Sequence, residues 1–401
     1  NTAIGSYALT ANTANNNVAV GNDSLKANTT GANNTALGYN SLDVNTTASS
    51  NTALGSESLG ANTTGADNTA VGKSALGANT TASYNNAMGV SALASNTTGA
   101  NNVAIGYAAL TANTTGAQNT AVGHESLDAN TTGSYNQAFG QHTLTTNTTG
   151  QYNSAFGWGA LFSNTTADGN TAVGNLTLYN NSTGANNTAV GYNALNDNTT
   201  GNNITAVGQN ALATNTTGGD NTACGSIALD ANTTGTNNDA FGRNALGKNT
   251  TASNNVALGN NSLSNNTTGA YNTAGGVSAL FTSTTASNNT AFGYQSLYAN
   301  TTGDENTALG YYALKANTVG DRNVSLGSWT LHSFNPGSNA DTYNVAVGYN
   351  ALGSTTTGTN NTAVGGLVMA SNTTGYNNSA FGQQALEANT TGNNNVAVGQ
   401  A

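Results

Sequence analysis

The feature that most constrains this chain is a five-residue motif that recurs at a fixed distance along it. The motif N-T-A-L-G at residues 34–38 returns at residues 51–55, and its last copy is N-V-A-V-G at residues 395–399. Its closing glycine occurs 24 times, in steps of 17 residues except for a first step of 16 and a step of 21 from Gly327 to Gly348. Repetition of this kind overrides the expectation of several globular domains from length alone. We therefore expect one continuous array over residues 1–401, with an irregular insertion at 332–343.

One repeat, numbered from its first asparagine, reads N-T-A-V-G-x-x-A-L-x-A-N-T-T-G-x-x. The fourth place is apolar almost throughout, with Cys224 and Gly275 as exceptions, and the ninth is Leu or, once, Met369. Two large apolar residues in 17 are too few for an amphipathic helix, which needs one every three or four residues. The short runs Thr-Ala-Val and Ala-Leu, bounded by glycine and by Asn-Thr-Thr-Gly, favour strands instead.

Two arrangements of such strands compete. A meander of hairpins favours Asn-Gly or Asp-Gly turns, but the chain has no Asn-Gly and one Asp-Gly, at Asp168-Gly169. A β-solenoid instead places each strand parallel to its copy in the preceding coil. The sequence therefore predicts an all-β fold, a parallel β-solenoid with one 17-residue repeat per coil and 24 coils.

The repeat also predicts which places face inward. We expect the fourth and ninth places to point into the coil, and the small third and eighth places to mark close contact between its walls or with a neighbouring chain. Glycine at the fifth and fifteenth places suits the positive φ of corners. Asparagine at the first and twelfth places is expected to form hydrogen-bonded amide ladders along the axis.

Charge limits the partners that this chain can bind. Charged residues are 5% of the chain, and 16 acidic and six basic side chains give a net charge of −10. No basic face is available for a phosphate backbone, so we expect no nucleic-acid partner. No run of 18 apolar residues occurs, so we expect no membrane insertion within this segment. Cys224 is the single cysteine and cannot form an internal disulfide.

The sequence offers no evident catalytic or cofactor chemistry. His124 and His142 occupy variable places, without a His-Glu-x-x-His spacing or a cysteine partner, so no metal site is predicted. Carboxylates are scattered, and no paired acid and base recurs. We expect a non-enzymatic protein with no catalytic residues and no cofactor.

The Asn-Thr-Thr corners match the N-glycosylation sequon, and so leave two interpretations open. Modification would fall on asparagines at the twelfth place; an amide ladder followed by strand-favouring threonine would create the same triplet without modification. The candidates are Asn62, Asn113, Asn215 and Asn300. The threonine columns also raise ice binding, although adjacent threonines such as Thr46 and Thr47 are expected to point to opposite sides.

Tyrosine is the residue most suggestive of surface contact. Exposed aromatic rings suit glycan stacking or contact with another protein, while simple filling of a β-rich surface is the competing interpretation. The sixth-place candidates are Tyr39, Tyr107, Tyr192, Tyr294, Tyr311 and Tyr349. Pro336, the only proline, lies in the insertion, which we expect to bulge from the coils and to be a candidate recognition loop.

The repeated T-A-V-G, as at residues 171–174, and V-A-I-G at residues 103–106 resemble the S-V-A-I-G head repeats of trimeric autotransporter adhesins. The longer unit with its Asn-Thr-Thr-Gly corner also looks like repeats of phage and bacterial tail-fibre proteins. The resemblance implies a left-handed β-roll in which three chains pack side by side. The repeat here is longer than that of the adhesin heads, and their neck, stalk and anchor are not found in these residues.

Together these observations lead to a functional hypothesis. We expect a structural fibre or adhesin rod of a cell-surface filament or virion appendage, located outside the cell, on its surface or on a virion. Its partner is expected to be itself, laterally as a homotrimer and also end to end, because both terminal repeats are typical and lack capping features. A glycan or host-surface receptor is the further expected partner. The alternative is a solenoid face that binds a glycan or ice.

Overall fold

The computed structural model describes residues 1–400, and within them every regular element is a β-strand. The chain divides into two compact units, Asn1–Asn202 and Asn203–Ala401. In both, each copy of the motif forms one three-residue strand from the second to the fourth place of the repeat. Each strand pairs in parallel with its copy one repeat away, as in Thr35 with Thr52 and Ala36 with Ala53. The predicted parallel β-solenoid, with one repeat per coil, is confirmed.

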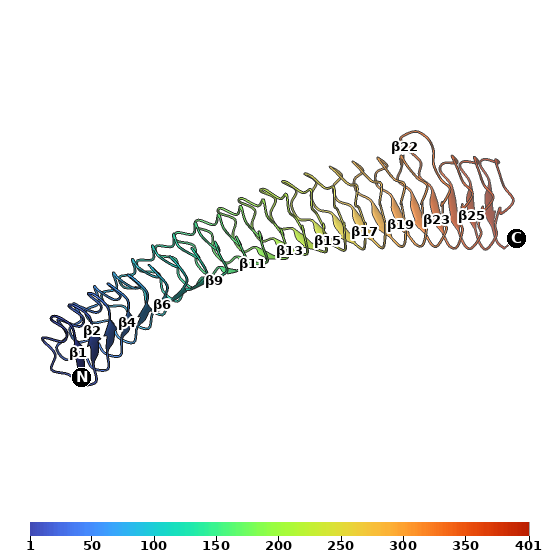
Figure 1. Ribbon diagram of the computed structural model, residues 1–401. Coiled ribbons are helices and arrows are strands. Elements are labelled where there is room, and N and C mark those ends of the chain that lie inside the picture. The colour runs from blue at the N-terminus through green and yellow to red at the C-terminus, as the bar shows by residue number, and fades with distance from the viewer. Residues whose placement is uncertain (401) are drawn as a thin grey trace. The chain divides into compact units, whose positions relative to one another are not determined.

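The first unit stacks its strands in chain order (Figure 1). They are β1 (Thr2–Ile4), β2 (Val18–Val20), β3 (Thr35–Leu37), β4 (Thr52–Leu54), β5 (Thr69–Val71), β6 (Asn86–Met88), β7 (Val103–Ile105), β8 (Thr120–Val122), β9 (Gln137–Phe139), β10 (Ser154–Phe156), β11 (Thr171–Val173) and β12 (Thr188–Val190).

The second unit repeats this arrangement and adds a short ladder of two-residue strands, β20 and β22. Its strands are β13 (Thr205–Val207), β14 (Thr222–Cys224), β15 (Asp239–Phe241), β16 (Val256–Leu258), β17 (Thr273–Gly275), β18 (Thr290–Phe292), β19 (Thr307–Leu309), β20 (Gly320–Asp321), β21 (Val324–Leu326), β22 (Ala340–Asp341), β23 (Val345–Val347), β24 (Thr362–Val364), β25 (Ser379–Phe381) and β26 (Val396–Val398).

Backbone hydrogen bonds join adjacent coils well beyond the strands. At the start of a strand, the backbone amide of Thr35 donates to the carbonyl of Asn51 at 2.9 Å. In the turn that follows, the backbone amide of Leu42 donates to the carbonyl of Ser58 at 3.1 Å. At the Asn-Thr-Thr corner, the amide of Thr46 donates to the carbonyl of Thr63 at 3.2 Å. Since buried backbone groups must be paired, these ladders explain how three-residue strands suffice to hold each coil.

The core of each coil is narrow and mixes small apolar, large apolar and amide side chains. Third-place alanine such as Ala36, eighth-place Ser or Ala such as Ser41, and ninth-place leucine such as Leu42 are all fully buried. The inward ninth place and the small third and eighth places were therefore predicted correctly. Large side chains at the third place would not fit, because the opposite wall of the coil lies too close.

The fourth place does not point inward, and this prediction was wrong. In β3 the burial runs half-buried, buried, exposed over Thr35, Ala36 and Leu37. Side chains alternate along a strand, so a buried third residue forces the second and fourth residues onto the outer face. Apolarity alone suggested burial at the fourth place, whereas the alternation and the restriction to alanine at the third place decide it.

The Ala-Leu run at the eighth and ninth places is a turn rather than the expected strand. The ninth-place leucines and Met369 have φ between 46° and 56°, in the left-handed region. Such φ values are uncommon for residues other than glycine and are worst for β-branched side chains. This explains why the buried apolar residue at this place is Leu or Met and never Val or Ile.

The fifth-place glycines meet two requirements at once. Their φ values lie between 118° and 144°, and a Cβ on Gly89 would lie 2.2 Å from the carbonyl oxygen of Gly106 in the next coil. The positive φ expected at the fifteenth place is absent: there a Cβ on Gly99 would meet the carbonyl oxygen of Gly116 at 2.2 Å. Close approach of neighbouring coils, rather than backbone conformation, favours glycine at the fifteenth place.

The predicted asparagine ladders are present, and their side chains are fully buried in the interior coils. At the twelfth place, the Nδ2 of Asn45 donates to the Oδ1 of Asn28 at 2.8 Å and to the carbonyl of Ala48 at 3.0 Å. At the first place, the backbone amide of Asn34 donates to the Oδ1 of Asn17 at 2.8 Å. Each amide thus links its own coil to the next.

The insertion is partly built into the coil and partly projecting. Phe334 takes the twelfth place and is fully buried, while residues 337–341 are exposed. The two strands β20 and β22 pair in parallel, and the loop that carries β22 rises from the coils of its unit (Figure 1). Arg322 fixes this loop through hydrogen bonds to Glu305, to Asp341 and to the hydroxyl of Tyr343.

Candidate interaction surface

The outer face of the strands presents a column of exposed apolar side chains at the fourth place of the repeat, here called the apolar column. Away from the ends of the first unit, the exposed fraction of a side chain in this column reaches 52%, at Met88. Leu93 of the same coil points into the core and has an exposed fraction of 0%. The most exposed members inside the units are Leu37, Met88, Ile105, Phe139, Phe156, Val173, Val190, Phe241, Leu258, Phe292, Leu309 and Phe381. Exposed contiguous apolar side chains mark surfaces that contact other molecules.

The residues beside the apolar column carry almost no charge. The second place of the repeat, on the same face of the strand, is mostly a half-buried threonine such as Thr52 or Thr69. Asp239 is the single charged residue at the second place, and the fourth place has none. A partner that covers this face therefore has to desolvate little charge, which is the main cost of covering a polar surface.

Neighbouring members of the apolar column contact one another along the axis. The rings of Phe139 and Phe156 stack with centroids 4.9 Å apart and planes at 4°. At Gly275, where the column lacks a side chain, a Cβ would lie 2.3 Å from the ring of Phe292. The ring of Phe292 thus covers the gap, and the column stays apolar there. Cys224 is exposed within the same column.

The six sixth-place tyrosines are all exposed, with fractions from 43% for Tyr294 to 61% for Tyr349. The structure brings only some of them together with other rings. Tyr294 stacks on Tyr311 at 5.6 Å, and Tyr107 stacks on His124 at 5.2 Å. Within residues 1–400, no ring contact involves Tyr39, Tyr192 or Tyr349.

One aromatic cluster stands out in the second unit, formed by Tyr294, Tyr311, Tyr312 and Trp329. The ring centroids of Tyr311 and Tyr312 lie 4.0 Å apart, and the ring of Tyr312 meets that of Trp329 edge-on with centroids 4.9 Å apart. A hydrogen bond with Tyr312 raises the pKa of the exposed Tyr311 hydroxyl. Tyr312 and Trp329 are 17 residues apart, at the seventh place of adjacent coils, which is the sequence signal that could have identified the cluster.

The four sequon asparagines are fully buried. The Nδ2 of Asn62 donates to the Oδ1 of Asn45 at 3.0 Å and to the carbonyl of Gly65 at 2.9 Å. That of Asn300 donates to the carbonyl of Gly303 at 2.8 Å. Glycosylation attaches at this nitrogen, so a glycan on a folded coil would displace ladder bonds. The hydrogen bonds favour the ladder interpretation of the triplet.

The candidate recognition loop projects beside Pro336 rather than at it. Pro336 is half-buried, and its ring would lie 3.0 Å from a Cβ on Gly320. The exposed residues are those that follow it, 337–341. The carboxylate of Asp341 at their end accepts hydrogen bonds from Arg322 and from the hydroxyl of Tyr343, so its base is held in place.

Among residues 1–400, no helix has the length and apolarity needed to cross a bilayer. Comparison of the sequence with protein-family models gives no match. Comparison with curated proteins likewise gives no match. The apolar column and the aromatic cluster therefore stand on their own geometry as the candidate functional surfaces of this solenoid.

Proposed function

We propose that this protein is a non-enzymatic structural fibre whose apolar column packs against other copies of the same chain. The single observation that supports the proposal most strongly is the column itself, an exposed apolar stripe on a sheet face with almost no charge. Burial of apolar surface contributes roughly 25 cal/mol for each Å² removed from water. A stripe repeated in every coil makes this contribution grow with the number of coils.

The spacing of the column favours a second copy as its occupant. Stacked strands lie about 4.8 Å apart, so the side chains of the column repeat at that distance along the axis. A partner can match every one of them only if its own surface repeats at the same distance. Another copy of the chain meets this condition without any further requirement, and symmetric self-association is the commonest form of assembly in soluble proteins.

We place three copies side by side, in line with the resemblance of the motif to the trimeric adhesin heads. In that arrangement the apolar columns lie at the centre, and the sixth-place tyrosines and the 337–341 loop stay available for contact with a surface. The fibre would act in attachment, as part of a cell-surface filament or a virion appendage.

A second candidate function, binding of a glycan, is favoured by the aromatic cluster. Sugar rings stack on exposed aromatic faces, and Tyr294, Tyr311 and Trp329 provide several faces within 6 Å of one another. Titration of glycans against the tryptophan fluorescence of a Trp158→Phe variant, in which Trp329 is the single tryptophan, tests this function. Saturable quenching that is lost in Tyr312→Ala supports it, and a flat response over a broad glycan panel would reject it.

The reactivity of Cys224 tests the main proposal, because this thiol lies in the apolar column. We expect slow reaction with a maleimide at high protein concentration, where copies associate, and fast reaction on dilution. The matched control is Cys224→Ser combined with Thr217→Cys, which places a thiol at an exposed fourteenth place. Its rate should not change with concentration. A Cys224 rate that is equally independent of concentration would overturn the proposed interface.

A further inference from the structure

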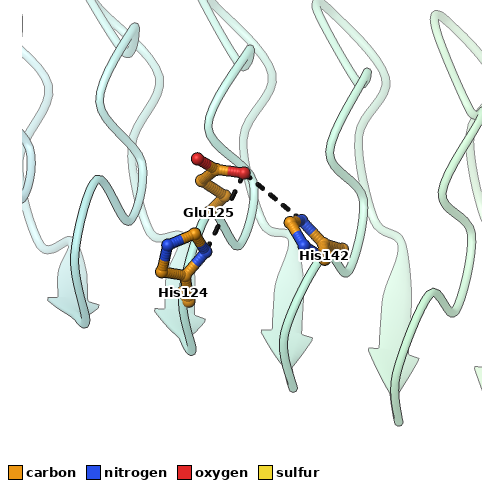
Figure 2. A group of neighbouring side chains, drawn as sticks. All are labelled: His124, Glu125 and His142. Atoms are coloured by element: carbon orange, nitrogen blue, oxygen red, sulfur yellow. Dashed lines mark ion pairs between the residues drawn. The ribbon is translucent and has the colours of Figure 1, made fainter.

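We propose that His124, Glu125 and His142 form a binding site for a divalent transition-metal ion, with Zn²⁺ as the best match. The three side chains come from two adjacent coils of the first unit and converge at its surface (Figure 2). The linear sequence gave no metal-ligand spacing. Glu125 and His142 are 17 residues apart, however, so the coil places both at the seventh position, one above the other.

The distances between the ligand atoms suit a shared ion. The Nδ1 of His142 lies 3.4 Å from the Oε2 of Glu125, and the Nδ1 of His124 lies 3.8 Å from the same oxygen. One ligand atom from each residue lies within 4.8 Å of the other two. Ligands about 2.1 Å from a tetrahedral ion are separated by about 3.4 Å. A small rotation of the exposed His124 ring would complete the approach.

Neighbouring side chains hold both imidazoles close to these positions. The ring of Tyr107 stacks on that of His124 with planes at 18°, and His124 meets His142 edge-on at 5.6 Å. The Nε2 of His142 lies 3.2 Å from the amide nitrogen of Gln141. A metal on Nδ1 leaves the ring proton on Nε2, so the Gln141 amide would turn its carbonyl oxygen toward the ring to accept that proton, which is how supporting residues commonly orient a metal-bound histidine.

The chemistry of the donor set selects the class of ion. Two imidazole nitrogens and one carboxylate oxygen suit Zn²⁺, Ni²⁺ and Cu²⁺, whereas Ca²⁺ and Mg²⁺ prefer oxygen ligands alone. Asp128 interacts electrostatically with Glu125 and His142 but is not one of the three ligand residues. Three protein ligands leave at least one coordination position for water or for a donor from another molecule.

Isothermal titration of the full chain with Zn²⁺ tests the site, with Co²⁺ absorption as the report on coordination. We expect one saturable site, with affinity reduced about tenfold or more in Glu125→Gln and in His142→Asn. Both variants are expected to fold: glutamine occupies the seventh place at Gln295 with φ 51°, and asparagine does so at Asn193 with φ 58°. Zn²⁺ at the same concentration should also raise the melting temperature of the wild type more than that of the variants, because it binds the folded state.

The matched control is His332→Asn, since His332 contacts Trp329 and Ser333 and lies outside the group. Its zinc affinity should equal that of the wild type. Absence of saturable binding up to about 1 mM Zn²⁺ would overturn the proposal. Equal affinity in wild type, Glu125→Gln and His142→Asn would overturn it as well.

Discussion

The Nδ2 of Asn113 donates one hydrogen bond to the Oδ1 of Asn96, at 2.8 Å, and another to the carbonyl of Gly116, at 2.9 Å. One side chain thus joins two coils and closes its own corner, in a site that water does not reach. Buried amides stabilise a fold only when their partners are present, and each missing partner costs about 1–3 kcal/mol. Where another residue interrupts the ladder, restoring an asparagine should therefore raise the free energy of unfolding.

Ser283 is such an interruption, and Ser283→Asn should stabilise the protein. Serine is too short to continue the ladder, so the buried Oδ1 of Asn266 and the buried Oγ of Ser283 both lack a hydrogen-bond partner. An asparagine at this place would supply the missing donor to Asn266 and an acceptor for Asn300. We expect the free energy of unfolding to rise by about 1–2 kcal/mol, measured by chemical denaturation. Thr268→Asn, at an exposed place, is the neutral control, and an equal gain in the two variants would refute the ladder explanation.

Gly89→Ala should destabilise the first unit strongly. Gly89 has φ of 140°, and the new Cβ would lie 2.2 Å from the carbonyl oxygen of Gly106. Left-handed strain alone costs about 1–3 kcal/mol, and the overlap adds to it. Gly60→Ala is the matched control, because its nearest neighbour would be 3.4 Å away and its φ is ordinary. Thermal unfolding should show a large drop for the first variant and almost none for the second; similar drops would mean that the glycine column is not required.

Leu110→Ile should cost more than an ordinary exchange between aliphatic residues of equal volume. Leu110 is fully buried with φ of 55°, a conformation in which a β-branched side chain is strained. Volume-conserving exchanges usually cost less than about 1.5 kcal/mol. Leu110→Met should stay within that limit, since Met369 occupies the same place with φ of 48°. Denaturation that ranks the two variants in the opposite order would show that the backbone conformation does not select this residue.

Asp230→Asn should stabilise the protein near neutral pH and have little effect in acid. Burial raises the pKa of the Asp230 carboxyl above its ordinary value, so the folded state holds this proton more tightly than the unfolded state does. The contribution of the protonated Asp230 carboxyl to stability is complete below the pKa that this group has in the unfolded state. It is lost as the pH rises through the pKa that the group has in the folded state. Since solvent screens this half-buried group, the gain at pH 7 should be at most about 0.5 kcal/mol. Melting curves of the two proteins should converge at about pH 2.5, below the ordinary pKa of aspartate; a gain that persists there would contradict the cause.

The repeat period predicts much of this fold because every coil obeys the same geometry. The ninth-place leucine was assigned to the core correctly, and the twelfth-place asparagine was correctly predicted to form an amide ladder, although its full burial was not predicted. The fourth place was misassigned because apolar character alone does not distinguish a core residue from an exposed one. The third-place alanine held the missing information, since a residue that is never large lies against an opposing wall.

The metal-ligand group and the aromatic cluster were harder to predict, because both depend on contacts between coils. Glu125 and His142 are brought together by the 17-residue period, and so are Tyr312 and Trp329. His124, at the sixth place, joins the group only because its ring turns toward Glu125. Comparison of equal places in successive repeats finds the first kind of pair, but side-chain direction requires the three-dimensional structure.

The most direct test of the central claim is sedimentation equilibrium of the wild-type chain and of a variant in which polar residues replace part of the apolar column. The variant replaces Phe139, Phe156, Phe241 and Phe292 by threonine, and a control replaces Tyr39 and Tyr192 by threonine outside the column. We expect the wild type and the control to sediment at three times the chain mass of 39.7 kDa, and the variant to remain folded by circular dichroism but to dissociate. A wild type that sediments at 39.7 kDa across the micromolar range, or a variant that associates as the wild type does, would contradict the account.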